Sequence, residues 1–134
     1  MAHEKAHVAA GYRCPLCPDH ADDEFVVSRI VGAPICEGCA IEISHFIEAD
    51  ERPDDLVLDR LEATTGLSFP EYQKLAFEEL VDDLAQRLLP ENIDREVEYQ
   101  RRITGQSREE VVDHWKTCVE TYNARIRRLA DGLT

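Results

Sequence analysis

Four of the five cysteines form two Cys-x-x-Cys pairs, and these residues are the best suited to chemistry in the sequence. Cys14 pairs with Cys17, Cys36 pairs with Cys39, and eighteen residues separate the two pairs. Each pair can turn two thiolates toward one ion, and two pairs can supply the sulfur tetrahedron that suits Zn²⁺. The spacing predicts a closed structural zinc site with these four ligands, which leaves no open position for catalysis.

Disulfide bonds are the other use of such cysteines, and the rest of the sequence argues against them. No apolar run is long enough to span a membrane, and residues 1–11 lack the apolar core of a secretory signal. We therefore expect a cytoplasmic protein whose cysteines meet a reducing environment. Under those conditions metal binding is favoured over disulfide formation.

The charge balance limits the classes of partner. The chain has 134 residues, a net charge of −13 and 43% hydrophobic residues, so it can form a core but carries a strongly acidic surface. Such a surface repels phosphate backbones and disfavours nucleic acid. Proteins with basic or mixed charge are the expected partners.

The order of elements around the cysteines predicts a small α+β module. Residues 25–31 are rich in β-branched residues and favour a strand, residues 32–34 favour a turn, and a short returning strand leads into Cys36. Apolar residues then recur at helical spacing from Ala40. We expect a flexible tail at 1–12, followed by a treble-clef-like zinc module at 13–50.

Residues 51–134 predict an all-α domain of about four helices. Gly66 and Gly105 are placed to end helices, and Ser68 with Glu71 and Ser107 with Glu110 form capping boxes at the helices that follow. Gly132 is expected after the last helix. The pattern Thr-Gly-x-Ser-x-x-Glu thus occurs twice, 39 positions apart. It indicates either a duplicated helical hairpin or two uses of the same turn chemistry.

The cysteine segment resembles the N-terminal zinc-binding domain of ClpX, an AAA+ unfoldase. The resemblance covers residues from about 13 to 50 and rests on Cys14-Pro15-Leu16-Cys17, the strand at 27–31 and Ile35-Cys36-Glu37-Gly38-Cys39. The chain lacks the Walker phosphate loop that an unfoldase motor needs. The resemblance implies a module that forms homodimers and docks unfoldase or protease components, or their substrates.

Three further histidine and cysteine side chains are candidates for chemistry. His20 lies near Cys17, but four cysteines already complete the tetrahedron, so we expect a solvated loop histidine. His114 and Cys118 share a face of the last helix and could form a second metal site or a nucleophilic pair. The alternative is a cysteine packed beside Trp115, and because no orienting group or oxyanion pocket is evident, we expect no catalytic residue and no enzyme.

These observations favour a non-enzymatic zinc-binding adaptor or recognition protein. Its zinc module is expected to present a hydrophobic surface that includes Phe25, Ile41 and Phe46. The alternative is a zinc-containing DNA-binding transcriptional regulator that uses the helix-turn-helix-like turn before Ser107. The arginines at 101, 102, 125, 127 and 128 could serve that role, or they could balance charge at helix C-termini.

Overall fold

The computed structural model describes residues 4–17, 24–49 and 51–133. The chain divides into two compact units, residues 1–73 and residues 74–134. We call the first the cysteine unit and the second the helical unit. The division falls inside one helix, so the helix that follows residue 54 belongs to the same unit as the four cysteines. A separate module at 13–50 stays a prediction.

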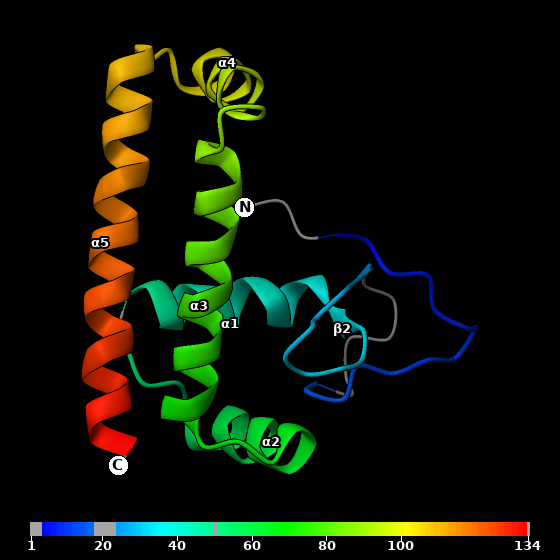
Figure 1. The fold of residues 1–134 in the computed structure, drawn as a ribbon. Coiled ribbons are helices and arrows are strands. Elements are labelled where there is room, and N and C mark those ends of the chain that lie inside the picture. Colours follow the sequence, from blue (N-terminus) through cyan, green and yellow to red (C-terminus); the bar gives the residue numbers. More distant parts are fainter. Residues whose placement is uncertain (1–3, 18–23, 50, 134) are drawn as a thin grey trace. The chain divides into compact units, whose positions relative to one another are not determined.

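The cysteine unit is built on a short antiparallel hairpin (Figure 1). Strand β1 (Phe25–Val26) pairs with β2 (Ile35–Cys36), with Phe25 opposite Cys36. The predicted strand over 25–31 is therefore too long. Ser28 ends it, because its hydroxyl accepts a hydrogen bond from the Val31 amide at 3.2 Å and its carbonyl accepts one from the Gly32 amide at 2.9 Å.

The segment at 4–12, which the sequence suggests is part of a flexible tail, is attached to this hairpin. Lys5 forms an antiparallel bridge with Val26, next to hydrogen bonds from the Val27 amide to the Glu4 carbonyl and from the Ala6 amide to the Phe25 carbonyl. Farther along, the Tyr12 hydroxyl donates to the Pro34 carbonyl at 2.8 Å. The segment thus contacts β1 and the connection that leads into β2. Residues 1–3 lie outside the described residues.

Two helices complete the cysteine unit. Helix α1 (Glu37–Ala49) follows β2 directly, and α2 (Asp55–Thr65) follows after a short connection. The unit also includes the first turn of α3 (Phe69–Leu88). Apolar side chains from the hairpin and from each of these helices are buried: Phe25, Val26, Ile35, Ile43, Ile47, Leu61 and Tyr72.

The helical unit consists of most of α3 with α4 (Ile93–Thr104) and α5 (Arg108–Leu133). Its buried cluster joins all three helices through Leu84, Val97, Val111 and Trp115. Phe77 stacks on Tyr122 with ring centroids 5.4 Å apart, so α3 and α5 lie side by side in this unit (Figure 1). Gly132 does not end α5, which continues through Leu133.

Both predicted capping boxes are confirmed. At α3 the Glu71 amide donates to the Ser68 hydroxyl at 3.3 Å, while the Ser68 amide donates to the Glu71 carboxylate at 3.1 Å. The equivalent pair before α5, Ser107 and Glu110, makes the same two bonds at 3.2 Å. Each box satisfies amides that a helix start leaves without an intrahelical partner.

The glycines that precede the two capping boxes also share one backbone conformation. Gly66 and Gly105 both adopt left-handed conformations, with φ of 74° and 73°, and each donates its amide to the carbonyl four residues earlier. Only glycine adopts this conformation without strain from a Cβ atom. The two repeats of the sequence pattern therefore have the same turn structure.

The predicted fold class is confirmed. Over the described residues, a two-stranded hairpin precedes five helices, and the cysteines lie where the hairpin meets the first helix. No helix among these residues has the length and apolar character needed to cross a membrane.

Candidate metal centre

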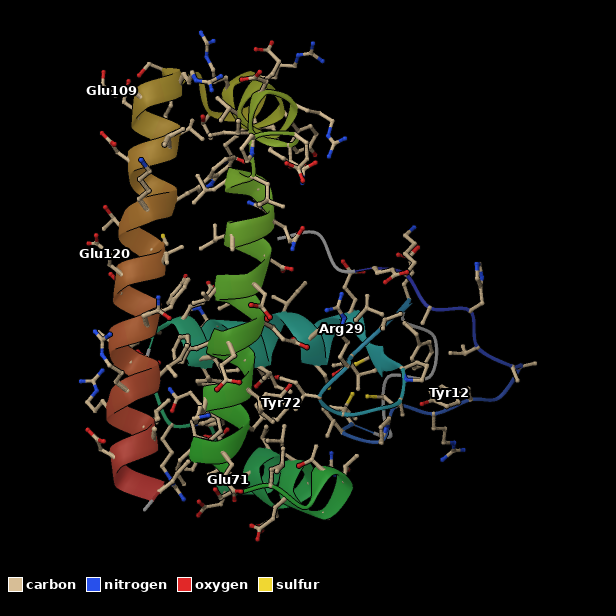
Figure 2. The ribbon with its side chains drawn as sticks, in the orientation of Figure 1. Tyr12, Arg29, Glu71, Tyr72, Glu109 and Glu120 are labelled. Carbon is tan, nitrogen blue, oxygen red and sulfur yellow. The ribbon has the colours of Figure 1, made fainter. Side chains whose placement is uncertain are left out.

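The hairpin and α1 bring the four cysteines together. Cys14 and Cys17 lie in the loop before the hairpin, Cys36 is the last residue of β2, and Cys39 lies in the first turn of α1. Their four Sγ atoms all lie within 4.8 Å of one another. We call these atoms the sulfur cluster. Figure 2 shows the side chains of this region, with sulfur in yellow.

The dimensions of the sulfur cluster suit one tetrahedral ion. Zinc–sulfur bonds of about 2.3 Å place the sulfurs of a regular tetrahedron about 3.8 Å apart. The Sγ atoms of Cys17 and Cys36 lie 3.1 Å apart, and no pair exceeds 4.8 Å. No disulfide links any of the five cysteines, all of which are among the described residues. An all-sulfur donor set of this size fits Zn²⁺ better than the hard cations that prefer oxygen.

Burial indicates a closed site. Cys14, Cys36 and Cys39 are buried, and Cys17 is half-buried. A catalytic zinc keeps one position open for water or substrate, whereas a structural zinc is enclosed by four protein ligands. The cluster has the composition and burial of the structural kind.

Backbone amides point at two of the sulfurs. The Cys36 amide donates to Cys14 Sγ at 3.3 Å, and the Cys39 amide donates to Cys36 Sγ at 3.4 Å. Amide donors stabilise thiolate charge, which a metal-bound cysteine retains. The second of these bonds comes from the first turn of α1, where amides have no intrahelical acceptor. The start of α1 therefore contributes to the site electrostatically as well as through its cysteine.

The thiols differ in their readiness to ionise. Burial acts to raise the pKa of Cys14, but amide donors led by Cys36 outweigh it and lower that pKa. Burial raises the pKa of Cys17 to about 12 and raises the pKa of Cys39 further above its usual range. A metal that binds here must therefore displace protons from buried thiols, as zinc does in structural sites.

One residue that contacts this region was not predicted from the sequence. The Arg60 guanidinium, on α2, donates from Nη1 to the Leu16 carbonyl at 3.2 Å. Leu16 lies between Cys14 and Cys17, so the contact joins the first cysteine pair to a helix 44 positions away. The sequence near Arg60 or near Leu16 gives no indication that these two residues are in contact.

The His114 and Cys118 pair forms as predicted from their spacing, but the described residues bring no third metal ligand to it. Cys118 Sγ lies 3.7 Å from His114 Nε2, and Cys118 also packs against the cluster that contains Trp115. Among the described residues, the four cysteines are the one group of three or more side chains that could hold a metal. His20 lies outside those residues.

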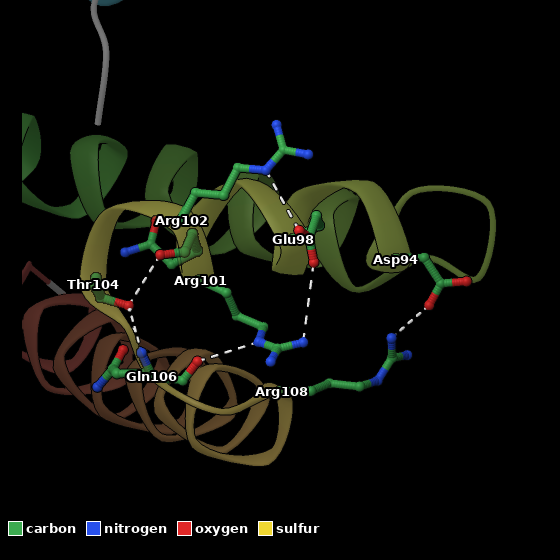
Figure 3. Close-up of polar contacts among 8 residues, drawn as sticks. Asp94, Glu98, Arg101, Arg102, Thr104, Gln106 and Arg108 are labelled. Atoms are coloured by element: carbon green, nitrogen blue, oxygen red, sulfur yellow. Dashed lines mark hydrogen bonds and ion pairs between the residues drawn. The ribbon is translucent and has the colours of Figure 1, made fainter.

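The arginines near the α4–α5 turn contact acidic residues and the turn itself (Figure 3). Arg102 contacts Glu98 at 3.4 Å, and Arg101 contacts the same carboxylate at 4.0 Å and the Gln106 carbonyl at 3.3 Å. Arg108 pairs with Asp94. These contacts balance charge locally. They supply no observation that favours a DNA-binding role.

The predicted hydrophobic surface is only partly present. Phe25 is 6% exposed, because it lies in β1 and packs edge-on against Tyr12 with ring centroids 5.2 Å apart. Its assignment to the surface is therefore wrong. Phe46 is half-buried, whereas Ile41 on α1 is 55% exposed. Of the three candidates, Ile41 is the one available to a partner.

Comparison with known proteins gives no match to a protein-family model, a curated protein or a solved structure. The likeness to the ClpX zinc domain therefore rests on the cysteine spacing and the residues around it. The four clustered cysteines are consistent with a zinc-binding module.

Proposed function

We propose that this protein is a non-enzymatic, zinc-binding recognition protein in which one Zn²⁺ is held by Cys14, Cys17, Cys36 and Cys39. The observation that carries the proposal is the convergence of the four Sγ atoms within 4.8 Å, largely shielded from solvent. Zinc would shape the docking surface and take no part in a reaction, because four sulfurs leave no coordination position for a substrate.

The partner that we propose is a basic protein segment. Residues 1–73 contain fifteen Asp and Glu against five Lys and Arg, whereas residues 74–134 contain thirteen against ten. The net charge is thus −10 in residues 1–73 and −3 in residues 74–134, so most of the net negative charge belongs to the cysteine unit. A zinc–tetrathiolate centre adds about −2 to it. Charge of one sign on a binding surface accelerates association with partners of the opposite sign.

Ile41 is the proposed apolar anchor on that surface. It is 55% exposed on α1, on the same helix face as Glu37 four residues earlier. An exposed aliphatic side chain beside a carboxylate suits a segment with an apolar residue flanked by Lys or Arg. The ClpX resemblance further suggests a cytoplasmic setting, homodimerisation and partners from an unfoldase or protease system.

Zinc content tests the first part of the proposal. Purified protein is expected to hold one zinc ion per chain, Cys36→Ser is expected to lose it, and Cys118→Ser is the matched control that keeps it. Elemental analysis after dialysis measures all three. Equal zinc content in the two serine variants would rule out the assigned site.

Partner capture tests the second part. A protein captured from the native host by the wild type is expected to be lost by Cys36→Ser and weakened by Ile41→Glu. Leu56→Glu is the control, because Leu56 is 61% exposed on α2 in the same unit. Light scattering with and without chelator reports the oligomeric state. Capture that survives both Cys36→Ser and Ile41→Glu would argue against recognition by the zinc-shaped surface.

A further inference from the structure

The contact between Arg60 and Leu16 reaches the metal centre from outside the two cysteine pairs. Arg60 is half-buried on α2, and its Nη1 donates to the Leu16 carbonyl at 3.2 Å. The Leu16 side chain is itself only 5% exposed. A charged group placed against a buried part of the chain has a desolvation cost, which its hydrogen bond offsets.

The peptide group between Leu16 and Cys17 connects this contact to a sulfur. No peptide bond among the described residues is cis, so the carbonyl of Leu16 and the amide of Cys17 point in opposite directions. The amide of Cys17 hydrogen-bonds Cys14. One planar group therefore has the guanidinium on its oxygen and a metal-binding sulfur on its N–H, and hydrogen bonds in such a chain polarise one another.

The negative charge of the cysteine unit also supports a role for Arg60 at the metal centre. Four thiolates around one Zn²⁺ leave a net charge of about −2 in a unit that is already acidic. Two other basic side chains of the unit have carboxylate partners: Lys5 contacts Glu24, and Arg52 contacts Asp55. Arg60 is a basic residue from a distant helix whose guanidinium contacts the backbone of the first cysteine pair.

We propose that Arg60 is a positioning residue of the metal centre. Its guanidinium fixes the Leu16 carbonyl, orients the Cys17 amide toward Cys14 and places positive charge on the backbone between the first two cysteines. The inference rests on the proposed zinc site and extends it, because it makes α2 part of the structure that the metal organises. Zinc binding and the order of residues 55–65 are then coupled.

Zinc affinity of matched variants tests this role. Arg60→Met removes the charge and the donor but keeps an apolar stem, Arg60→Lys keeps the charge without the planar fork, and Arg52→Met is the control for loss of one positive charge from the same unit. Competition with a chromogenic chelator gives the affinity. Removal of a group that orients a metal ligand typically weakens metal binding by about 10- to 100-fold, which is the loss expected for Arg60→Met. Arg60→Lys should fall between it and the wild type, and Arg52→Met should match the wild type.

Cobalt substitution separates failure of this inference from failure of the zinc site. Wild-type protein loaded with Co²⁺ should show the absorption of a tetrahedral tetrathiolate centre, and its absence would reject the proposed site itself. If that spectrum is present and Arg60→Met binds zinc as tightly as the wild type, or no more weakly than Arg52→Met, the positioning role is overturned. Should Arg60→Met fail to fold with excess zinc, Arg60→Lys decides by the same comparison.

Hydrogen exchange gives a readout that a packing role alone would not move. In the wild type, chelation should reduce the protection of amides in α2, whereas in Arg60→Met zinc should protect those amides less than it does in the wild type. Protection of α2 that is insensitive to chelation in the wild type would contradict the coupling.

Discussion

The cysteine unit and the helical unit are held in their folded structures by different kinds of contact. Three long helices satisfy most of the backbone of the helical unit, and four buried side chains from those helices form its cluster. The cysteine unit has two strands of two residues each, and much of its chain is loop. Its order depends on separate anchors, including the sulfur cluster, Tyr12 and Arg60. A metal centre can thus replace the regular secondary structure that a short segment lacks.

Metal removal should separate the two units most clearly. Structural zinc contributes about 10–16 kcal/mol of apparent binding free energy in small modules, so chelation should unfold the cysteine unit and leave the helical unit largely helical. Trp115, the single tryptophan, reports on the helical unit through its fluorescence. Hydrogen exchange reports on both units. A change in Trp115 fluorescence in step with loss of protection in the hairpin would show that the units unfold together.

Trp115→Ala should destabilise the helical unit and leave the cysteine unit unchanged. The side chain is 3% exposed in the cluster of the helical unit, so its removal should cost about 3–5 kcal/mol of unfolding free energy. Zinc content should stay at the wild-type level. The control is Tyr99→Ala on α4, where the side chain is 64% exposed and the change should stay within about 0.5 kcal/mol. Loss of zinc from Trp115→Ala would contradict the independence of the two units.

The two capping boxes allow the effect of the same Ser→Ala substitution to be compared between the two units. Ser68→Ala and Ser107→Ala each remove a hydroxyl that accepts an amide hydrogen bond, so each should cost about 1 kcal/mol. Chemical denaturation measures both, with zinc present throughout. The control is Ser44→Ala, because Ser44 lies inside α1 and caps no helix start. Unequal costs at the two boxes would show that the same turn chemistry contributes differently in each unit.

The smallest expected effect is the pH dependence of the capping contact made by Glu71. Hydrogen bonds led by the Ser68 amide lower the pKa of its carboxyl group. A lowered folded-state pKa means that the capping contribution is present above the ordinary glutamate pKa and is lost as pH falls through the lowered value. The Ser68 amide shift, followed by NMR, should titrate below the ordinary range, and Glu71→Gln should abolish the titration. A midpoint at or above the ordinary value would contradict the capping geometry.

Features set by neighbouring residues were predicted best. Cysteine spacing indicated the sulfur cluster, and Gly105 with the Ser107–Glu110 box marked the α4–α5 turn, because those hydrogen bonds close within a few residues. The length of β1 was missed, since the Ser28 side chain competes with the strand for the Val31 amide. Local chemistry overrode β-propensity there.

Features that need distant residues were not predictable in this way. Phe25 has a strand pattern that allows either face to be buried, and only its pairing and the approach of Tyr12 decide which. The attachment of residues 4–6 to β1 and the contact of Arg60 with Leu16 join segments whose local sequence contains no sign of the partner. The candidate metal ligands could be named in advance, but the side chains that hold them in place could not.

Because Cys118 lies outside the sulfur cluster, the number of thiols that can be labelled per chain should report metal occupancy. Four thiols belong to the cluster, and the fifth lies on α5 beside His114. A thiol-directed maleimide should therefore modify one site per chain when zinc is bound and five after denaturation in chelator. Intact mass spectrometry distinguishes these species in a mixture, so a single spectrum should give the fraction of molecules that carry the metal.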